Sequence, residues 1–316
     1  MLIDDIKTVA VIGGGTIGAG WVTLFATKGY NVNLYSRKAE TRERSMQLFN
    51  SNVDFMAKKK VIAKKVAKDS LTRVSLFEEM KPAVEKADFI VESVADNLDL
   101  KKAIFKDLDL FSGKEVILAS SSSGLLMTEI QKVAQRPGRC IIAHPWNPPH
   151  LIPLVEVVPG RDTTSETTDF TYKFMSSLGK IPVLVKKEVN GYIGNRLAAA
   201  LWREAVDLVQ KGVASVEDVD KALYAGPGIR WAFMGQHLIY HLGGGKEGIG
   251  HFVDHLGRAT FKSIWEDMAT WNYISDPMKT MLVEGVKEET RGREIDELIK
   301  WRNDKLIELL KVIYSG

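Results

Sequence analysis

Cysteine occurs only once in the 316 residues, at Cys140, so the chain cannot form an internal disulfide. A single thiol is typical of a protein from a reducing compartment. The sequence also lacks any apolar run near the roughly 20 residues that a membrane-spanning helix needs. Its first residues include Asp4 and Asp5 and lead directly into an apolar strand, unlike a signal peptide. We therefore expect a cytoplasmic protein without a membrane partner.

Excess charge and metal-binding motifs are equally scarce. The formal net charge is only +3, and no basic stripe is interleaved with aromatic residues, so nothing supports binding to nucleic acid. His251 and His255 have the i,i+4 spacing of metal ligands on a helix, but no HExxH motif or added carboxylate accompanies them. We therefore expect neither a nucleic-acid partner nor a metal site.

The chain does contain, at its start, one complete strand–helix–strand unit. Residues Thr8–Ile12 form an apolar run that is typical of a strand buried on both faces. A helix follows and ends at Gly29, which suits the left-handed position after a helix. The next predicted strand is Asn31–Tyr35. This unit predicts a parallel sheet with a right-handed crossover.

The glycine-rich turn between this strand and helix is typical of a dinucleotide-binding site. Glycine lets the backbone approach a pyrophosphate, and the helix N-terminus supplies N–H groups. A tight turn without a ligand is the alternative, but the strand before it and the helix after it favour binding. The predicted cofactor contacts here are Gly13, Gly15, Thr16, Ile17 and Gly18.

The end of the second strand departs from the usual dinucleotide pattern. An acidic residue there normally binds the 2′-hydroxyl of the adenosine ribose, whereas this chain has Ser36, Arg37 and Lys38. A serine hydroxyl and a guanidinium can hold a 2′-phosphate instead. Ser36 and Arg37 are therefore predicted cofactor contacts that admit NADP beside NAD.

The pattern along the chain predicts two domains. Residues 1–189 alternate strands and helices, with a helical hairpin inserted near residues 39–71. Residues 190–316 are predicted to be helical and begin with a long amphipathic helix. The fold class is therefore α/β: a doubly wound Rossmann-type sheet domain followed by an all-α C-terminal domain. We expect the second domain to cover the substrate cleft and to dimerise.

The stretch from His144 to Glu156 is the strongest candidate for acid–base chemistry. It joins two apolar, strand-like runs through a proline-rich turn, His-Pro-Trp-Asn-Pro-Pro-His-Leu-Ile-Pro-Leu-Val-Glu. A histidine leaving one strand and a carboxylate in the next can meet across that turn, as a general base and its orienting partner require. The alternatives are a loop histidine bonded to backbone and a structural ion pair for Glu156.

Several separate motifs together resemble the L-3-hydroxyacyl-CoA dehydrogenase superfamily over essentially the whole length. They are Val11–Gly18, Ile90–Leu98 with Lys101, Ser120–Ser123, His144–Glu156 and Gly191–Arg196. Two stretches near the C-terminus are more similar to the λ-crystallin / L-gulonate 3-dehydrogenase branch and to the L-carnitine dehydrogenases. These stretches are Gly228–Gly235 and Trp301–Lys305.

The resemblance implies a role for each matched residue. It implies that His144 is the base and that Glu156 is its partner. It also implies that Ser123 and Asn195 hydrogen-bond the substrate and that one asparagine of the proline-rich turn lies beside the base. The residues implied to lie near the cofactor are Asp96, Lys101, Ser123 and Asn147.

The residues themselves leave three of these assignments open. Ser123 also fits a cap of the helix that follows it, and Asn195, in a first helical turn, also fits a purely structural role. A lysine cluster in the hairpin fits a solvated helix face, although the resemblance implies a contact to the phosphates of CoA. Its members are Lys58, Lys59, Lys60, Lys64, Lys65 and Lys68.

The resemblance implies an NAD(P)-dependent oxidoreductase that oxidises the 3-hydroxyl of an L-3-hydroxyacyl compound. The expected type is a 3-hydroxyacyl-CoA dehydrogenase of fatty acid metabolism. One alternative is a dehydrogenase of a free 3-hydroxy acid such as L-gulonate or L-carnitine. Another is a non-catalytic, crystallin-like protein that only binds the cofactor. The expected partners are a small-molecule substrate and a second copy of the chain in a homodimer.

Overall fold

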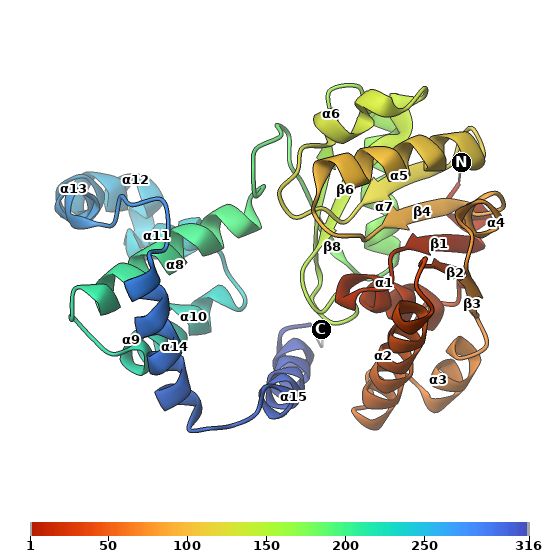
Figure 1. Cartoon of the computed structure of the whole chain (residues 1–316). Helices are drawn as coiled ribbons and strands as arrows, with labels where there is room; N and C mark the ends of the chain where they lie inside the picture. The colour runs from red at the N-terminus through yellow and green to blue at the C-terminus, as the bar shows by residue number, and fades with distance from the viewer. Residues whose placement is uncertain (1, 315–316) are drawn as a thin grey trace. The chain divides into compact units, whose positions relative to one another are not determined.

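The computed structural model describes residues 2–314, which fall into two compact units (Figure 1). Within the described residues, the first unit ends at Arg196 and the second begins at Leu197. The division therefore falls within the first turn of helix α8 (Gly194–Gln210). Within the described residues, no helix combines the length and the apolar character needed to cross a membrane.

The first unit is built on one eight-stranded sheet with the order β3-β2-β1-β4-β5-β6-β7-β8. Neighbouring strands are parallel except β6 and β7, which are antiparallel. The order from β3 to β6 is that of a doubly wound dinucleotide-binding sheet, so the predicted fold class is confirmed. The strands are β1 (Thr8–Ile12), β2 (Asn31–Tyr35), β3 (Val74–Phe77), β4 (Phe89–Glu92), β5 (Ile117–Ser120), β6 (Cys140–Pro145), β7 (Leu154–Pro159) and β8 (Ile181–Leu184).

Helices cover both faces of this sheet. The first apolar cluster holds residues of α1 (Thr16–Thr27), α2 (Ala39–Lys58), α3 (Lys64–Ser70) and α7 (Ser165–Ser177). The second holds residues of α4 (Met80–Val84), α5 (Leu98–Phe111) and α6 (Met127–Ile130). Strand β1 serves both: Val9 and Val11 belong to the first cluster, and Ala10 and Ile12 to the second. This explains why its sequence is apolar without alternation.

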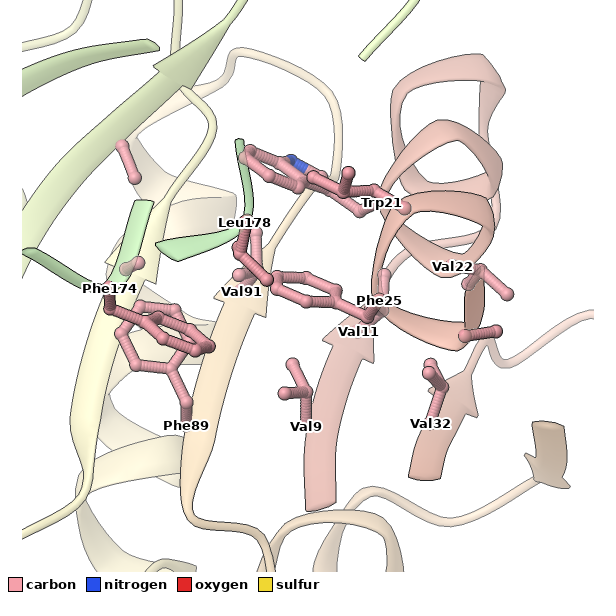
Figure 2. Close-up of a cluster of buried hydrophobic side chains, with 14 of the residues drawn as sticks. Val9, Val11, Trp21, Val22, Phe25, Val32, Phe89, Val91, Phe174 and Leu178 are labelled. Carbon is pink, nitrogen blue, oxygen red and sulfur yellow. The ribbon is translucent and has the colours of Figure 1, made fainter. Parts of the chain in front are cut away.

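Aromatic rings hold α1 and α7 against the first face. Phe25 lies between Trp21 and Phe174, with ring centroids 5.4 and 6.1 Å away. Phe174 also contacts Phe89 of β4, with 4.8 Å between the centroids, and Figure 2 shows these rings beside the strands. Because α1 begins at the glycine-rich turn, this packing fixes the direction in which the N–H groups of that turn point.

Two elements of the first unit were not expected from the sequence. Strand β3 lies at the edge of the sheet, and none of its residues is fully buried. It therefore lacks the apolar run that marks the central strands, and helix α4, directly after it, is a single short turn. The expected hairpin consists of α2 and α3, with the chain turning at Lys60, whose φ is +56°.

The second unit is formed by helices in its described part. The Ser215 side chain accepts a hydrogen bond from the Asp218 N–H and caps α9 (Val216–Ala225). A π-helical turn at Val253–Gly257 links two of the helices. Beyond α8, the helices are α9 (Val216–Ala225), α10 (Pro227–Trp231), α11 (Gln236–Gly243), α12 (Gly248–Phe252), α13 (Arg258–Asp267), α14 (Asp276–Thr290) and α15 (Ile295–Tyr314).

Candidate active site

The glycine-rich turn has the close approaches that a dinucleotide site needs. Gly13 has φ +113°, and a Cβ there would lie 2.6 Å from the Ser93 carbonyl oxygen. A Cβ on Gly18 would lie 1.9 Å from the Gly13 carbonyl oxygen. Gly15, at the N-cap of α1, faces open space and has no side chain to cap the helix. The first N–H groups of α1 are therefore available to a pyrophosphate.

A cavity of about 270 Å³ lies beside this turn and has room for such a group. Its lining residues are Gly14, Gly15, Thr16, Glu40, Thr41 and Arg44. At the end of β2, Arg42 donates to the Ser36 carbonyl oxygen at 2.7 Å, which fixes the backbone of that loop. Ser36 is half-buried and Arg37 is exposed. Their contact with a 2′-phosphate stays a prediction.

A second cavity, of about 210 Å³, brings several predicted site residues together. Ile17 comes from the start of α1, Asp96 follows β4, Ser123 follows β5, and His144 lies in β6. The carboxyl ends of these neighbouring parallel strands meet at one edge of the sheet, where open α/β sheets bind ligands. The remaining lining residues are Ser93, Val94, Ser121 and Pro145.

His144 and Glu156 form a buried pair in this site. They stand directly opposite each other in the antiparallel β6–β7 register. The Nδ1 atom of His144 lies 2.8 Å from Oε2 of Glu156, and the two residues are only 6% and 1% exposed. The other carboxylate oxygen accepts hydrogen bonds from the Ile193 and Gly194 N–H groups, at 2.8 and 2.9 Å.

These contacts determine the charge and the tautomer of the pair. Burial raises the pKa of Glu156, but the hydrogen bonds from His144, Gly194 and Ile193 outweigh it and bring the pKa below its ordinary value. An ionised carboxylate can only accept hydrogen bonds, so His144 donates its Nδ1–H to Glu156. The Nε2 atom then carries the lone pair that a general base needs.

Asp96, Ser123 and Asn195 are linked by hydrogen bonds. The backbone N–H and the hydroxyl of Ser123 both donate to Asp96, at 3.0 and 2.8 Å. Asn195 donates its side-chain N–H to the Ser123 carbonyl oxygen at 2.9 Å. The N-cap of α6 is Leu126, so Ser123 does not cap that helix. The structure thus brings Asn195 to the loop after β5, although it does not line the cavity.

Lys101 is fully buried below this loop and does not line the cavity. Its ammonium donates to both carboxylate oxygens of Glu92, at 2.7 and 2.9 Å, and lies 3.4 Å from Asp96. Burial raises the pKa of Asp96, but the bonds from Ser123 and the charge of Lys101 bring it below its ordinary value.

Glu92 was missed by the sequence reasoning. Ser120 donates its hydroxyl to this fully buried carboxylate at 2.6 Å, beside the Lys101 ion pair. A signal for it was present, because an acidic residue in the apolar strand Phe89–Glu92 must find a buried partner.

One other predicted site residue, Asn147, follows β6, is exposed and does not line the cavity. In the second unit, the His251 and His255 rings are 3.9 Å apart, and His251 pairs with Glu247 at 3.0 Å. Within residues 2–314, no cluster of three or more His, Cys, Asp or Glu side chains could hold a metal ion.

The buried Glu156 carboxylate predicts how stability depends on pH. Its folded-state pKa lies below the unfolded value of about 4.3. The ionised form therefore contributes stability above that pH, and this contribution is lost as the pH falls through the folded-state pKa. Urea unfolding should show Glu156→Gln less stable than the parent by roughly 1.5–3 kcal/mol at pH 6. The difference in unfolding free energy between the parent and Glu156→Gln should become smaller towards pH 3.

Glu129→Gln is the matched control, because Glu129 is only half-buried and its salt bridge is with the exposed Lys132. It should change stability little at either pH. A gap for Glu156→Gln that is the same at pH 6 and pH 3 would contradict the assigned charge.

Comparison with known proteins agrees with this geometry. Residues 8–189 match the family model of the 3-hydroxyacyl-CoA dehydrogenase NAD-binding domain, and residues 191–283 match that of the C-terminal domain. The chain is 39% identical over 311 residues to an L-carnitine dehydrogenase of Bacillus cereus, covering 98% of this chain and 93% of the other. It is 38% identical to an L-carnitine dehydrogenase of Oceanobacillus iheyensis, covering 97% and 98%.

Among solved structures, one similar fold is that of 5-formyl-3-hydroxy-2-methylpyridine 4-carboxylic acid 5-dehydrogenase, an NAD-dependent dismutase. Its TM-score is 0.79 at 28% identity, over 98% of both chains. Another is the (S)-3-hydroxybutyryl-CoA dehydrogenase of Ralstonia eutropha, with a TM-score of 0.67 at 26% identity, over 79% and 85%. The resemblance seen in the sequence motifs and the predicted NAD cofactor are thus confirmed. The chain belongs to the 3-hydroxyacyl-CoA dehydrogenase family and is an NAD-dependent oxidoreductase that acts on a CH–OH group.

Proposed function

We propose that the protein oxidises the 3-hydroxyl of a free L-3-hydroxy acid of the L-carnitine type. The observation that carries this proposal is the similarity to L-carnitine dehydrogenases over almost the whole of both chains. The sequence motifs alone favour an acyl-CoA thioester, and this stays the second candidate. The cellular location and a place in fatty acid metabolism also stay predictions.

In this mechanism His144 is the base. Its Nε2 lone pair accepts the proton of the substrate hydroxyl while hydride leaves the carbon that bears this hydroxyl. Bound NAD supplies the hydride acceptor at its nicotinamide ring. Glu156 stabilises the resulting imidazolium through the 2.8 Å contact with Nδ1. The N–H groups of Ile193 and Gly194 hold Glu156 in place and ionised, so the ring keeps its orientation during the proton transfer.

Trp146 supports a cationic substrate. Its half-buried ring lies beside His144, with 6.5 Å between the ring centroids. It packs closely on Gly194, where a Cβ would lie 2.7 Å from the indole. L-Carnitine carries a trimethylammonium group on the carbon next to its reacting carbon, and quaternary ammonium groups bind to aromatic faces. An indole held this close to the base can attract that group while the hydroxyl faces His144.

The lysine cluster of the hairpin is the observation in favour of a CoA substrate. Most of these lysines are exposed on α2, α3 and the turn between them. Lys65 forms an i,i+4 ion pair with Asp69 at 2.8 Å. This arrangement equally fits a solvated helix face, so only a substrate comparison separates the two candidates.

A panel of three substrates tests the proposal. It consists of L-carnitine, its neutral isostere with carbon in place of the quaternary nitrogen, and L-3-hydroxybutyryl-CoA. With NAD at saturation, kcat/KM should be highest for L-carnitine. The isostere should lose roughly 5–30-fold, because a desolvated cation–π contact contributes about 1–2 kcal/mol. Trp146→Leu should remove most of the difference between L-carnitine and its isostere.

The control is the triple variant Lys60→Ala, Lys64→Ala, Lys65→Ala. If the protein uses a free acid, this variant should turn over L-carnitine as the parent does. A higher kcat/KM for the thioester, with a KM that rises only for the thioester in the triple variant, would replace the proposal by the CoA candidate. Binding of NAD without turnover of any panel member would favour the non-catalytic alternative.

We further propose that the second unit mediates a homodimer. Most of the exposed large apolar side chains of the described chain lie after Arg196, among them Trp202, Phe233 and Trp265. Soluble monomers rarely expose so much apolar surface. Only a few apolar residues in the described part of the second unit are buried, namely Val206, Val216, Ala269, Met278 and Ile307.

Light scattering at micromolar concentration should therefore give twice the 35.2 kDa mass of one chain. Trp202→Glu, which places a charge on this surface, should shift the mass towards one chain, whereas Tyr172→Glu on the first unit should not. A parent protein that stays at 35.2 kDa at these concentrations would contradict the proposal.

A further inference from the structure

Lys180 is a buried cation that the mechanism above does not use. It follows the left-handed Gly179 at the end of α7 and immediately precedes β8. Only 8% of the residue is exposed. Its ammonium donates to the Pro149 carbonyl oxygen and, at 2.8 Å, to the Ile152 carbonyl oxygen. Both acceptors belong to the loop between β6 and β7, which joins His144 to Glu156.

The sequence of this loop explains why it needs such a donor. Prolines at 148, 149 and 153 have no N–H, so the loop has more carbonyl acceptors than backbone donors. The Pro148 carbonyl accepts from Leu151 and Ile152, both at 3.0 Å. The Pro153 carbonyl accepts from Ile181 at 2.9 Å. The Lys180 ammonium binds the carbonyl groups of Pro149 and Ile152.

This arrangement carries an electrostatic cost. Burial, and then the charge of Lys28 at the end of α1, lower the pKa of Lys180 to about 7. The ammonium donates hydrogen bonds to two carbonyl groups rather than to a carboxylate. An ammonium in such a place is unfavourable unless it is well hydrogen-bonded. Both of these ammonium hydrogen bonds are with the loop between β6 and β7.

The loop is also held from the other side. A Cβ on Gly20 of α1 would lie 2.5 Å from Pro149, so the loop lies directly against the helix that begins at the glycine-rich turn. One end of the loop carries Trp146 and Asn147, which follow Pro145, the last residue of β6 and the neighbour of His144. A shift of the loop would therefore move these two side chains relative to the base.

We propose that Lys180 is a positioning residue that holds the β6–β7 loop against α1 and thereby fixes Trp146 beside His144. It acts through the Pro149 and Ile152 carbonyl groups and touches no reacting atom. The proposal rests on the proposed function only for the choice of substrate in the kinetic measurement.

Lys180→Met tests it, because methionine keeps most of the volume and removes the donor. Hydrogen exchange of the protein without ligand should speed up roughly 10–100-fold at the Leu151 and Ile152 amides, the range expected for losing hydrogen bonds from a charged group. The kcat/KM for L-carnitine should fall by up to roughly 100-fold, as for a misplaced reacting geometry. The Kd for NAD should stay unchanged, because the glycine-rich turn is untouched.

Lys28→Met is the matched control, since it removes the neighbouring exposed charge and leaves the loop contacts in place. It should leave exchange at Leu151 and Ile152 as in the parent. Lys180→Gln, which keeps an N–H donor, should show an intermediate effect and serves if the methionine variant does not fold. Parent-like loop exchange in the Lys180 variants, or an equal increase in Lys28→Met, would overturn the proposal. If the parent does not oxidise L-carnitine, the proposed function fails while the exchange measurement still decides the role of Lys180.

Discussion

The contact between His144 and Glu156 is the interaction on which the rest of the site depends. Through one carboxylate it joins three segments: β6, which carries His144, β7, which carries Glu156, and the segment that leads into α8, where the Ile193 and Gly194 N–H groups bind the second oxygen. The three donors keep the carboxylate ionised in a buried place, and the ionised carboxylate in turn fixes the tautomer of the imidazole. The charge of the Glu156 carboxylate and the orientation of the imidazole therefore have the same cause.

Other buried charged side chains near the site are also held by hydrogen bonds from neighbouring elements. The carboxylate of Glu92, at the end of β4, accepts hydrogen bonds from Lys101 and Ser120. Behind the loop between β6 and β7, Lys180 is held by carbonyl groups. Neither Glu92 nor Lys180 lines the cavity. Glu92 directly precedes Ser93, which does line it. Lys180 binds the loop that carries Asn147, a predicted site residue. In such a site, precision comes from the surrounding residues that lock each side chain.

Much of this site could be predicted from the sequence. The turn from His144 to Glu156 lies between two apolar strands, which predicted that the two side chains meet, and the glycine-rich turn predicted the NAD site. The register could not be predicted, because a slip of one residue would turn Glu156 to the opposite face of the sheet. The role of Lys101 also depended on a tertiary partner, Glu92, whose carboxylate draws it into the interior. Strand β3 escaped prediction because an exposed edge strand carries little apolar pattern.

The central claim is that His144 is the general base of an NAD-dependent oxidation. The most direct test is the kcat of His144→Asn, measured with the preferred substrate of the parent beside the Kd for NAD. We expect a kcat lower by roughly 10²–10⁴-fold, the usual contribution of a general base. We also expect an unchanged Kd for NAD, because the glycine-rich turn is separate from the imidazole. A His144→Asn protein that keeps the kcat of the parent would show that His144 is not the base.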